Sequence, residues 1–160
     1  MPQIIVETLI NCDQETCFDL ARDIGFYKNS LKKSTEIPIE GKISGLVEKG
    51  DVTIWETNHL NLMQHLTLKV TEYNRPEKFV DEMIKGEFKS YRHEHIFELK
   101  ANKTLMIDKF YFESSYGILG KIVDNFFLKR HIIKLLLTRN AVLKQKAEEL
   151  SSSKRLAYFR

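Results

Sequence analysis

Between residues 51 and 113, apolar and polar positions alternate in five short runs that are separated by turn-forming residues. Alternation of this kind is typical of strands that bury one face, and short turns between consecutive strands favour an antiparallel meander. In one run, Leu66, Leu68 and Val70 share a face, whereas Thr67 and Lys69 lie on the other. The pattern predicts strands over residues 51–60, 63–73, 78–84, 90–100 and 104–113.

The segment before this meander predicts one further strand and two short helices. Asn11-Cys12-Asp13 offers side chains that can cap a following helix, in which Cys17, Phe18 and Ala21 share one side. Pro38 cannot donate to the ladder of a central strand, so residues 32–49 are expected to hold an edge strand or a loop. The pattern places the strand at residues 3–9 and the helices at residues 14–22 and 26–31.

From residue 120 the apolar positions recur with a helical period, which predicts one amphipathic helix that ends near residue 150. Such a helix is about 45 Å long, enough to cross a domain of this size. Residues 151–160 lose the period and are expected to form a flexible basic tail. The apolar stripe consists of Ile122, Phe126, Ile133, Leu136, Leu137, Leu143, Ala147 and Leu150.

An antiparallel sheet has one face to bury, and only this helix is long enough to cover it. The sequence therefore predicts an α+β fold in which a curved antiparallel sheet of six to seven strands grips a long C-terminal helix. Two short helices follow the first strand. Residues 1–150 are expected to form a single ligand-binding domain with a cavity of roughly 300–1,000 Å³ between helix and sheet.

Composition and charge narrow the class of protein. A chain of 160 residues with 42% hydrophobic and 29% charged residues fits one globular domain. The N-terminus lacks a secretory pattern and no apolar run reaches about 18 residues, so a cytoplasmic location is expected. Cys12 and Cys17 are expected to be free thiols in a reducing compartment. Residues 120–160 are basic, but no nucleic-acid partner is expected because no recognised module accompanies them.

Polar side chains recur on the strand faces that should point inward. Alternation puts Tyr91, His93, His95, Phe97 and Leu99 on one face, and this face is the more apolar one. The corresponding faces of the neighbouring strands add further aromatic, imidazole and carboxylate groups. The predicted ligand-binding set is Trp55, His59, Phe79, Asp81, Tyr91, His93, His95, Phe97, Asp108, Phe110, Phe112, Phe126 and Phe127.

Imidazoles and carboxylates in an apolar wall are costly unless they are paired, so the inward polar set needs an explanation. Asp–His and Tyr–His pairs can satisfy one another and fix the strand register. They can also anchor the polar end of a ligand. The candidates for acid–base catalysis are His93, His95, Asp81 and Asp108. Two histidines and a carboxylate could hold a metal, but His-x-His on a strand is a weak signal, and neither a metal nor a cofactor is expected.

Several stretches of the chain are similar to one known group of proteins: Gly50-Asp51, Trp55-Glu56, Arg75-Pro76, Phe79-Val80-Asp81, Gly86-x-Phe88, His93-Glu94-His95, Gly117-x-x-Gly120 and Leu135 to Asn140. With these stretches the chain resembles the helix-grip superfamily, also called SRPBCC. That superfamily includes START lipid-transfer domains, pollen-allergen-type binders and polyketide cyclase/dehydrase-like proteins. More narrowly, the chain resembles a bacterial branch often labelled cell-division-inhibitor-like. The resemblance implies binding of apolar molecules and carries no shared set of catalytic residues.

These observations predict a carrier or sensor that binds a small, largely apolar or amphipathic molecule between sheet and helix. One alternative is a cyclase, dehydratase or hydrolase that uses a His–Asp pair in the cavity. Another is a regulatory partner protein, as the name of the branch suggests. Phe126, Phe127 and Leu128 beside Lys129 and Arg130 could contact a membrane surface, although the core is the expected place for the two phenylalanines. The chain is expected to be a monomer or a weak homodimer.

Overall fold

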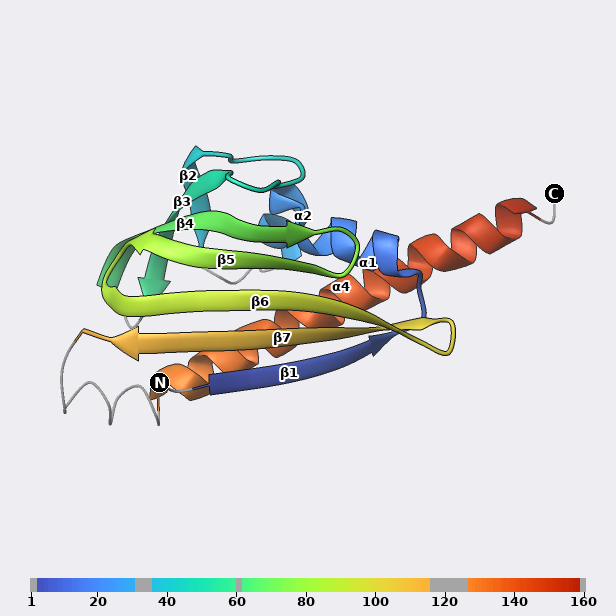
Figure 1. Cartoon of the computed structure of the whole chain (residues 1–160). Helices are drawn as coiled ribbons and strands as arrows, with labels where there is room; N and C mark the ends of the chain where they lie inside the picture. Colours follow the sequence, from blue (N-terminus) through green and yellow to red (C-terminus); the bar gives the residue numbers. More distant parts are fainter. Residues whose placement is uncertain (1–2, 31–35, 60–61, 116–126, 159–160) are drawn as a thin grey trace.

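The computed structural model describes residues 3–30, 36–59, 62–115 and 127–158, except for the side chains at positions 58, 59, 62 and 114. Its strands form one antiparallel sheet in the order β1-β7-β6-β5-β4-β3-β2 (Figure 1). Consecutive strands from β2 to β7 are neighbours, so this part is the predicted meander. The strands are β1 (Gln3–Ile10), β2 (Ile37–Gly41), β3 (Val52–His59), β4 (Leu62–Asn74), β5 (Lys78–Lys85), β6 (Phe88–Lys100) and β7 (Lys103–Ser114).

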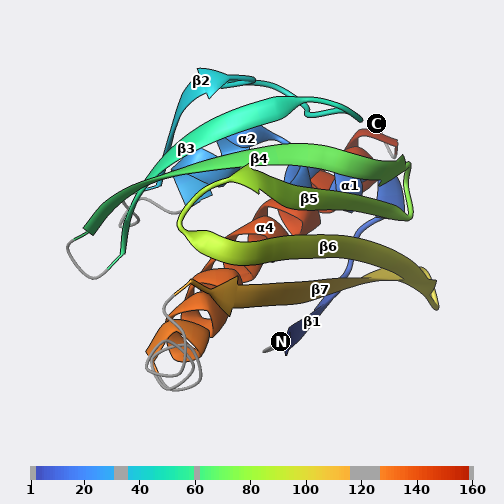
Figure 2. The same cartoon turned by 60° about the vertical axis from the view of Figure 1, so that its left-hand side comes forward.

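The sheet curves around one long helix, α4 (Lys129–Tyr158), which crosses its concave side (Figure 2). Two short helices after the first strand, α1 (Gln14–Ala21) and α2 (Ile24–Ser30), lie beside it. The long helix packs against β1, α1 and α2. The predicted α+β helix-grip architecture is therefore confirmed, including the number of strands and the place of the two short helices.

The first short helix begins where its sequence predicts and seals one part of the core. Asp13 caps it, because its side chain accepts a hydrogen bond from the Thr16 amide at 2.8 Å. Phe18 is fully buried and meets the rings of Phe79 and Phe97 edge to face at 5.4 Å each. Such contacts add to the gain from burying large aromatic surfaces. This cluster fixes α1 against β5 and β6.

A second cluster holds the long helix on the sheet. Ile132 and Leu136 of α4 pack with Phe110 and Phe112 of β7 and with Ile4 of β1, and all five are buried. On the helix, Leu143 and Ala147 continue the same stripe into the first cluster. The apolar period read from the sequence thus marks the face of α4 that meets the sheet.

The edge of the sheet at β2 confirms what Pro38 predicts. Pro38 pairs with Trp55 of β3, and the register shifts between Pro38 and Glu40. Because β2 is the last strand of the sheet, it has no second neighbour that would need a backbone donor from Pro38. Gly41 has a φ of 79°, and a Cβ there would lie 2.2 Å from the Val52 carbonyl oxygen, so this turn needs glycine.

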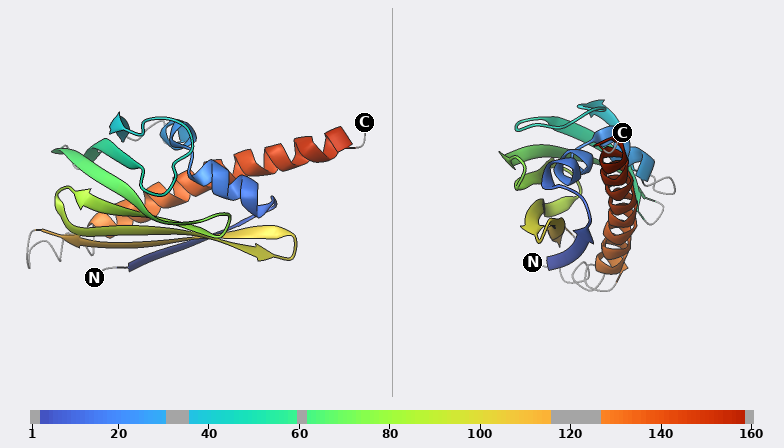
Figure 3. Two further views of the ribbon diagram at one scale, coloured as in Figure 1. Left: turned by 45° about the horizontal axis from the view of Figure 1, so that its top comes forward. Right: turned by 90° about the vertical axis from the view of Figure 1, so that its right-hand side faces the viewer.

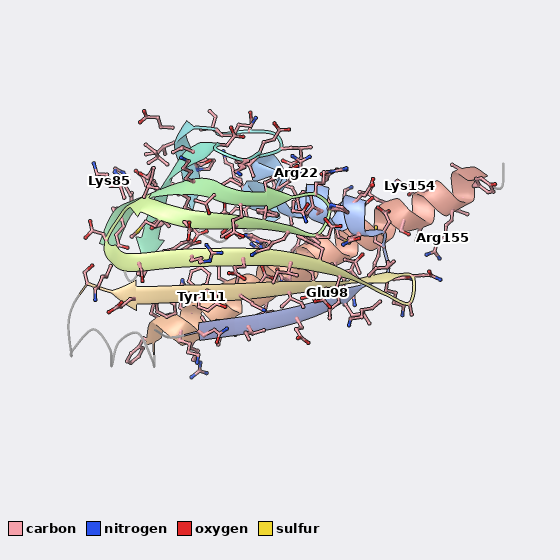
Figure 4. All side chains as sticks on the ribbon, viewed as in Figure 1. Arg22, Lys85, Glu98, Tyr111, Lys154 and Arg155 are labelled. Atoms are coloured by element: carbon pink, nitrogen blue, oxygen red, sulfur yellow. The ribbon has the colours of Figure 1, made fainter. Side chains whose placement is uncertain are left out.

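The helix boundary predicted near residue 150 is wrong, because α4 continues to Tyr158 and extends beyond the sheet (Figure 3). Leu156 and Tyr158 are exposed, so the last turns have no core to cover and need no apolar stripe. Lys154 and Arg155 lie on this projecting end (Figure 4). The predicted helical start at residues 120–126 lies outside the described residues. No described helix is both long and apolar enough to cross a membrane.

Candidate ligand cavity

A cavity of about 120 Å³ lies between the concave side of the sheet and the helices α2 and α4. Most of its wall is apolar: Leu66, Leu68 and Val70 come from β4, and Ile132 and Leu136 come from α4. The cavity predicted from the sequence is present, but it is smaller than the expected 300–1,000 Å³. Several long side chains are part of its wall, namely those of Tyr27, Trp55, Tyr91 and Arg139.

Seven of the residues predicted to bind a ligand line this cavity. Strand alternation explains the agreement, since side chains two residues apart on β5 and β6 point to the same side. Leu99, which the same alternation places inward, is 64% exposed near the β6–β7 turn. The seven lining residues are Trp55, Phe79, Asp81, Tyr91, His93, His95 and Phe110.

Three predicted residues are buried in the core and do not line the cavity. Phe97 packs against Phe18, and Phe112 packs against Phe88 and Phe110. Asp108 is completely buried between the two histidines and the long helix.

Phe127, predicted to be part of the cavity wall, is 68% exposed, and its neighbour Leu128 lines the cavity instead. Residues 127 and 128 form a π-helical turn before α4 begins at Lys129, so the α-helical period predicted from residue 120 does not determine which way these two side chains point. The side chain of His59 and the whole of Phe126 lie outside the described residues.

Asp108 accepts hydrogen bonds from three other side chains. His93 Nε2 donates at 2.8 Å and Arg139 Nη2 at 2.6 Å to one carboxylate oxygen, and Asn140 Nδ2 donates at 2.6 Å to the other. Burial alone would raise the pKa of Asp108, but the Arg139 charge and the hydrogen bond from His93 hold that pKa well below its usual range. Asp108 is therefore an ionised carboxylate inside the core, matched by the cation of Arg139.

His93 is held as a neutral ring. Burial, with His95 beside it, lowers the pKa of His93 to about 4 against the opposing pull of Asp108. A carboxylate can only accept, so the proton of the neutral ring sits on Nε2 and is donated to Asp108. The other ring nitrogen, Nδ1, is therefore an acceptor.

His95 lies between the buried Asp108 and Asp81 on the cavity wall. Its Nε2 donates to Asp81 Oδ2 at 3.1 Å, and its ring stacks on Phe79 at 4.1 Å. The Nδ1 atom lies 3.3 Å from Asp108 Oδ1 but makes no hydrogen bond. The His93 and His95 rings are 3.8 Å apart. Asp81 is thus positioned by a histidine that is itself fixed by packing on both faces.

Two polar residues of α4, Arg139 and Asn140, belong to this site but were not among the residues predicted from the sequence. Arg139 and Asn140 are buried, three and four residues after Leu136 and before Leu143. That spacing puts both polar side chains on the stripe that faces the sheet. The signal was therefore available, since a charged residue on an apolar helical stripe needs a partner and Asp108 was already an inward candidate.

A second missed pair lies at the α2 side of the cavity. Tyr27 Oη donates to Glu36 Oε2 at 2.8 Å, and the Tyr27 ring packs on Trp55 at 5.1 Å. Burial raises the pKa of Glu36 and raises that of Tyr27 well above its ordinary value. Tyr27 therefore stays protonated and remains a donor, and Glu36 is easier to protonate than an exposed glutamate. The two residues are nine positions apart, and no motif in the sequence indicates that they pair.

The side chains of His93, His95 and Asp108 bring possible metal-ligating atoms within 4.8 Å of one another. The donor set does not fit a divalent ion well, because Arg139 already places a cation 2.6 Å from the Asp108 carboxylate. A metal would have to displace this guanidinium and leave it buried without a partner, which is costly. The described residues are therefore arranged as a hydrogen-bonded network.

No family model matches the sequence, and no curated protein sequence matches it either. Solved structures match over nearly the full chain. A protein of Thermus thermophilus aligns with a TM-score of 0.70 at 15% identity, covering 89% of this chain and 97% of its own. A START superfamily protein of Mycobacterium smegmatis aligns with a TM-score of 0.67 at 12% identity, covering 92% and 98%.

A plant protein shows the same similarity. The ginseng major latex-like protein 151 of Panax ginseng aligns with a TM-score of 0.67 at 14% identity, covering 91% of this chain and 97% of its own. At such identities the comparison establishes the fold, and the chain has the START-like helix-grip fold that the sequence predicts. The narrower resemblance to a cell-division-inhibitor-like branch stays a prediction.

Proposed function

We propose that this protein binds a small, largely apolar molecule in the cavity between sheet and α4, as a carrier or a sensor. The observation that carries the proposal is the cavity itself, whose exposed wall is mostly apolar and also includes polar groups that hydrogen bonds hold in place, such as Asp81 and His93. Ligand sites are commonly built in this way, with apolar surface for affinity and a few polar groups for orientation. The stacked rings of Phe79 and His95 show the two kinds of surface side by side, with Phe79 as the apolar one and His95 as the polar one.

The cavity volume sets the size of the molecule. At about 120 Å³ it is close to an engineered apolar cavity of about 150 Å³ that takes up benzene. The lining also includes His65, whose side chain is 62% exposed, so the cavity reaches the surface near β4. A molecule with one ring fits inside, and a longer substituent can extend past His65.

Acid–base catalysis is the second candidate, because His93 is oriented by a buried Asp108 and also lines the cavity. However, a general base works best when its pKa lies near the working pH, and the pKa of His93 is lowered to about 4. Its Nδ1 would then be a weak base at neutral pH. This argument favours binding over catalysis. The regulatory alternative rests only on the resemblance of the sequence.

The proposal can be tested with native mass spectrometry of protein taken from cells, followed by ligand-detected NMR with ethylbenzene as a one-ring probe. Binding of ethylbenzene, with or without a co-purified molecule, is the expected result. Leu68→Trp should fill the cavity and abolish binding. Lys69→Trp, one residue along β4 on the exposed face, is the matched control and should bind like the parent. No binding by the parent, or equal binding by both variants, would overturn the proposal.

A further inference from the structure

The cavity wall has more acidic than basic side chains, and the two kinds differ in how they are paired. The two cations, Arg22 and Arg139, are each bound to a carboxylate that does not line the cavity. Arg22 Nε lies 2.8 Å from Asp19, and Arg139 Nη2 lies 2.6 Å from Asp108. Both cations therefore already have a carboxylate partner, although Arg22 shares Asp19 with Arg75, which also lies 3.7 Å from Glu15. The acidic residues on the wall are Asp23, Glu36, Asp51 and Asp81.

Three of the four acids are occupied by short contacts within the chain. Asp23 accepts from the Phe26 amide at 3.1 Å, and Asp51 accepts from the Glu48 amide at 2.9 Å. Glu36 accepts from the Tyr27 hydroxyl at 2.8 Å.

Asp23 and Asp51 accept from backbone amides three residues away in their own turns. Asp81 differs in its place and its partner, because it lies on β5, the central strand of the sheet, and its Oδ2 is bound by the ring of His95 on the cavity wall. Its Oδ1 has no hydrogen-bond partner among the residues that the structure describes. The side chain is 22% exposed and borders the cavity.

The residues around Asp81 hold its carboxylate in the cavity wall, where a bound molecule can reach the free oxygen. His95 and Phe79 fix the carboxylate from one side, and Tyr91 lies on the same wall. Burial, together with the nearby Asp81 charge, raises the pKa of Tyr91 well above its ordinary value, so its hydroxyl stays protonated. An acceptor in an apolar wall is stabilised by any donor that can reach it, and a second carboxylate brought beside it would be repelled.

We propose that the cavity selects one-ring molecules whose polar group donates a hydrogen bond to Asp81, either a hydroxyl or an ammonium group, and that it discriminates against carboxylates. The inference rests on the proposed function, since it assigns the polar end of the same ligand. A hydroxyl can donate to Asp81 and accept from Tyr91, and an ammonium group also gains from the charge of Asp81. Arg139 does not reverse this preference, because Asp108 already compensates its charge.

The test compares four molecules of nearly the same shape by ligand-detected NMR and calorimetry at neutral pH: ethylbenzene, 2-phenylethanol, phenethylammonium and phenylacetate. The parent protein should bind the alcohol and the ammonium compound about tenfold or more tightly than ethylbenzene, and phenylacetate most weakly. Asp81→Leu should lose this preference while keeping ethylbenzene binding. Asp81→Asn, which preserves size, should weaken the ammonium compound most.

Glu82→Gln is the matched control, because Glu82 follows Asp81 on β5 but lies on the opposite face, where it pairs with Arg92 at 2.6 Å. It should leave all four affinities unchanged. Phenylacetate binding as tightly as the alcohol, or an unchanged preference in both Asp81 variants, would overturn the inference while the proposed function stands. If ethylbenzene and the other three compounds all fail to bind, the proposed function falls and the inference falls with it.

Discussion

His95 lies directly opposite Asp108 in the β6–β7 register, yet its Nε2 donates across the other neighbouring strand to Asp81 at 3.1 Å. His93, which lies opposite Asp81, donates instead to Asp108 at 2.8 Å. Each histidine thus bonds the carboxylate that faces the other one. The crossed pairs tie β5, β6 and β7 together and hold the two rings in contact.

The buried ion pair between helix and sheet should be essential for stability. Arg139→Leu leaves Asp108 buried without its cation, so the free energy of unfolding should fall by about 3–5 kcal/mol. Urea denaturation measures this change. Arg155→Leu, on the exposed end of the same helix, should change stability by less than about 0.5 kcal/mol. Equal effects of the two variants would show that the pair does not hold α4 on the sheet.

The neutral state of His93 should make stability depend on pH. Its pKa is about 4 in the folded protein against an ordinary value of 6.5, so the unfolded chain binds more protons between these values. The free energy of unfolding should therefore fall as the pH drops from 6.5 to 4, by up to about 3 kcal/mol. Below pH 4 His93 is protonated in both states, so it causes no further change in the free energy of unfolding.

Asp108 extends the same trend to lower pH. Its pKa is lower in the folded protein than the ordinary value of 3.8, so it stabilises the folded state at any pH above 3.8. This stabilisation is lost as the pH falls below 3.8 toward the folded-state pKa. Denaturation curves at several pH values separate the two groups. His93→Gln should remove the slope between pH 6.5 and 4 and keep the loss at lower pH. If the His93→Gln variant keeps the same dependence of the free energy of unfolding on pH between 6.5 and 4, a group other than His93 is responsible for it.

The projecting end of α4 should contribute little to stability. Its contacts with the body include Lys154, which donates to Thr16 at 3.1 Å and lies 3.7 Å from Asp13, and both contacts are exposed. Removing residues 152–160 should lower stability by less than about 1 kcal/mol, because exposed ion pairs are weak. Thermal melting checks this, with Ala147→Asp in the buried stripe as the destabilising comparison. A large loss on truncation would show that the domain extends through the tail.

The two thiols should be unreactive in the folded protein. Cys12 and Cys17 are free and buried, and burial raises the pKa of Cys17 to about 12. Since the thiolate is the reactive form, alkylation by iodoacetamide at pH 8 should be slow in buffer and rapid in urea. Mass spectrometry of the modified chain counts the alkylated sites. Rapid modification without denaturant would contradict the packing of α1.

The types and the order of the secondary-structure elements could be predicted from local patterns in the sequence. Alternation with period two and the change to a helical period are local signals, so the strands, the two short helices and the long helix were all predictable. The same alternation put Tyr91, His93 and His95 on the inward face. The helix stripe also contained Arg139 and Asn140, although their role becomes clear only beside Asp108.

The hydrogen-bond partners in the core could not be predicted in this way, because they depend on how the folded elements lie against one another. The choice of Asp81 for His95, and of Asp108 for His93, depends on how β5, β6 and β7 twist and on where α4 rests. The cavity volume depends on how far side chains such as Tyr27 extend into the interior. The end of α4 lies beyond the core and carries no apolar period to mark it. Local periodicity reports which face of an element is buried, whereas partners and volumes arise from contacts between residues far apart in the chain.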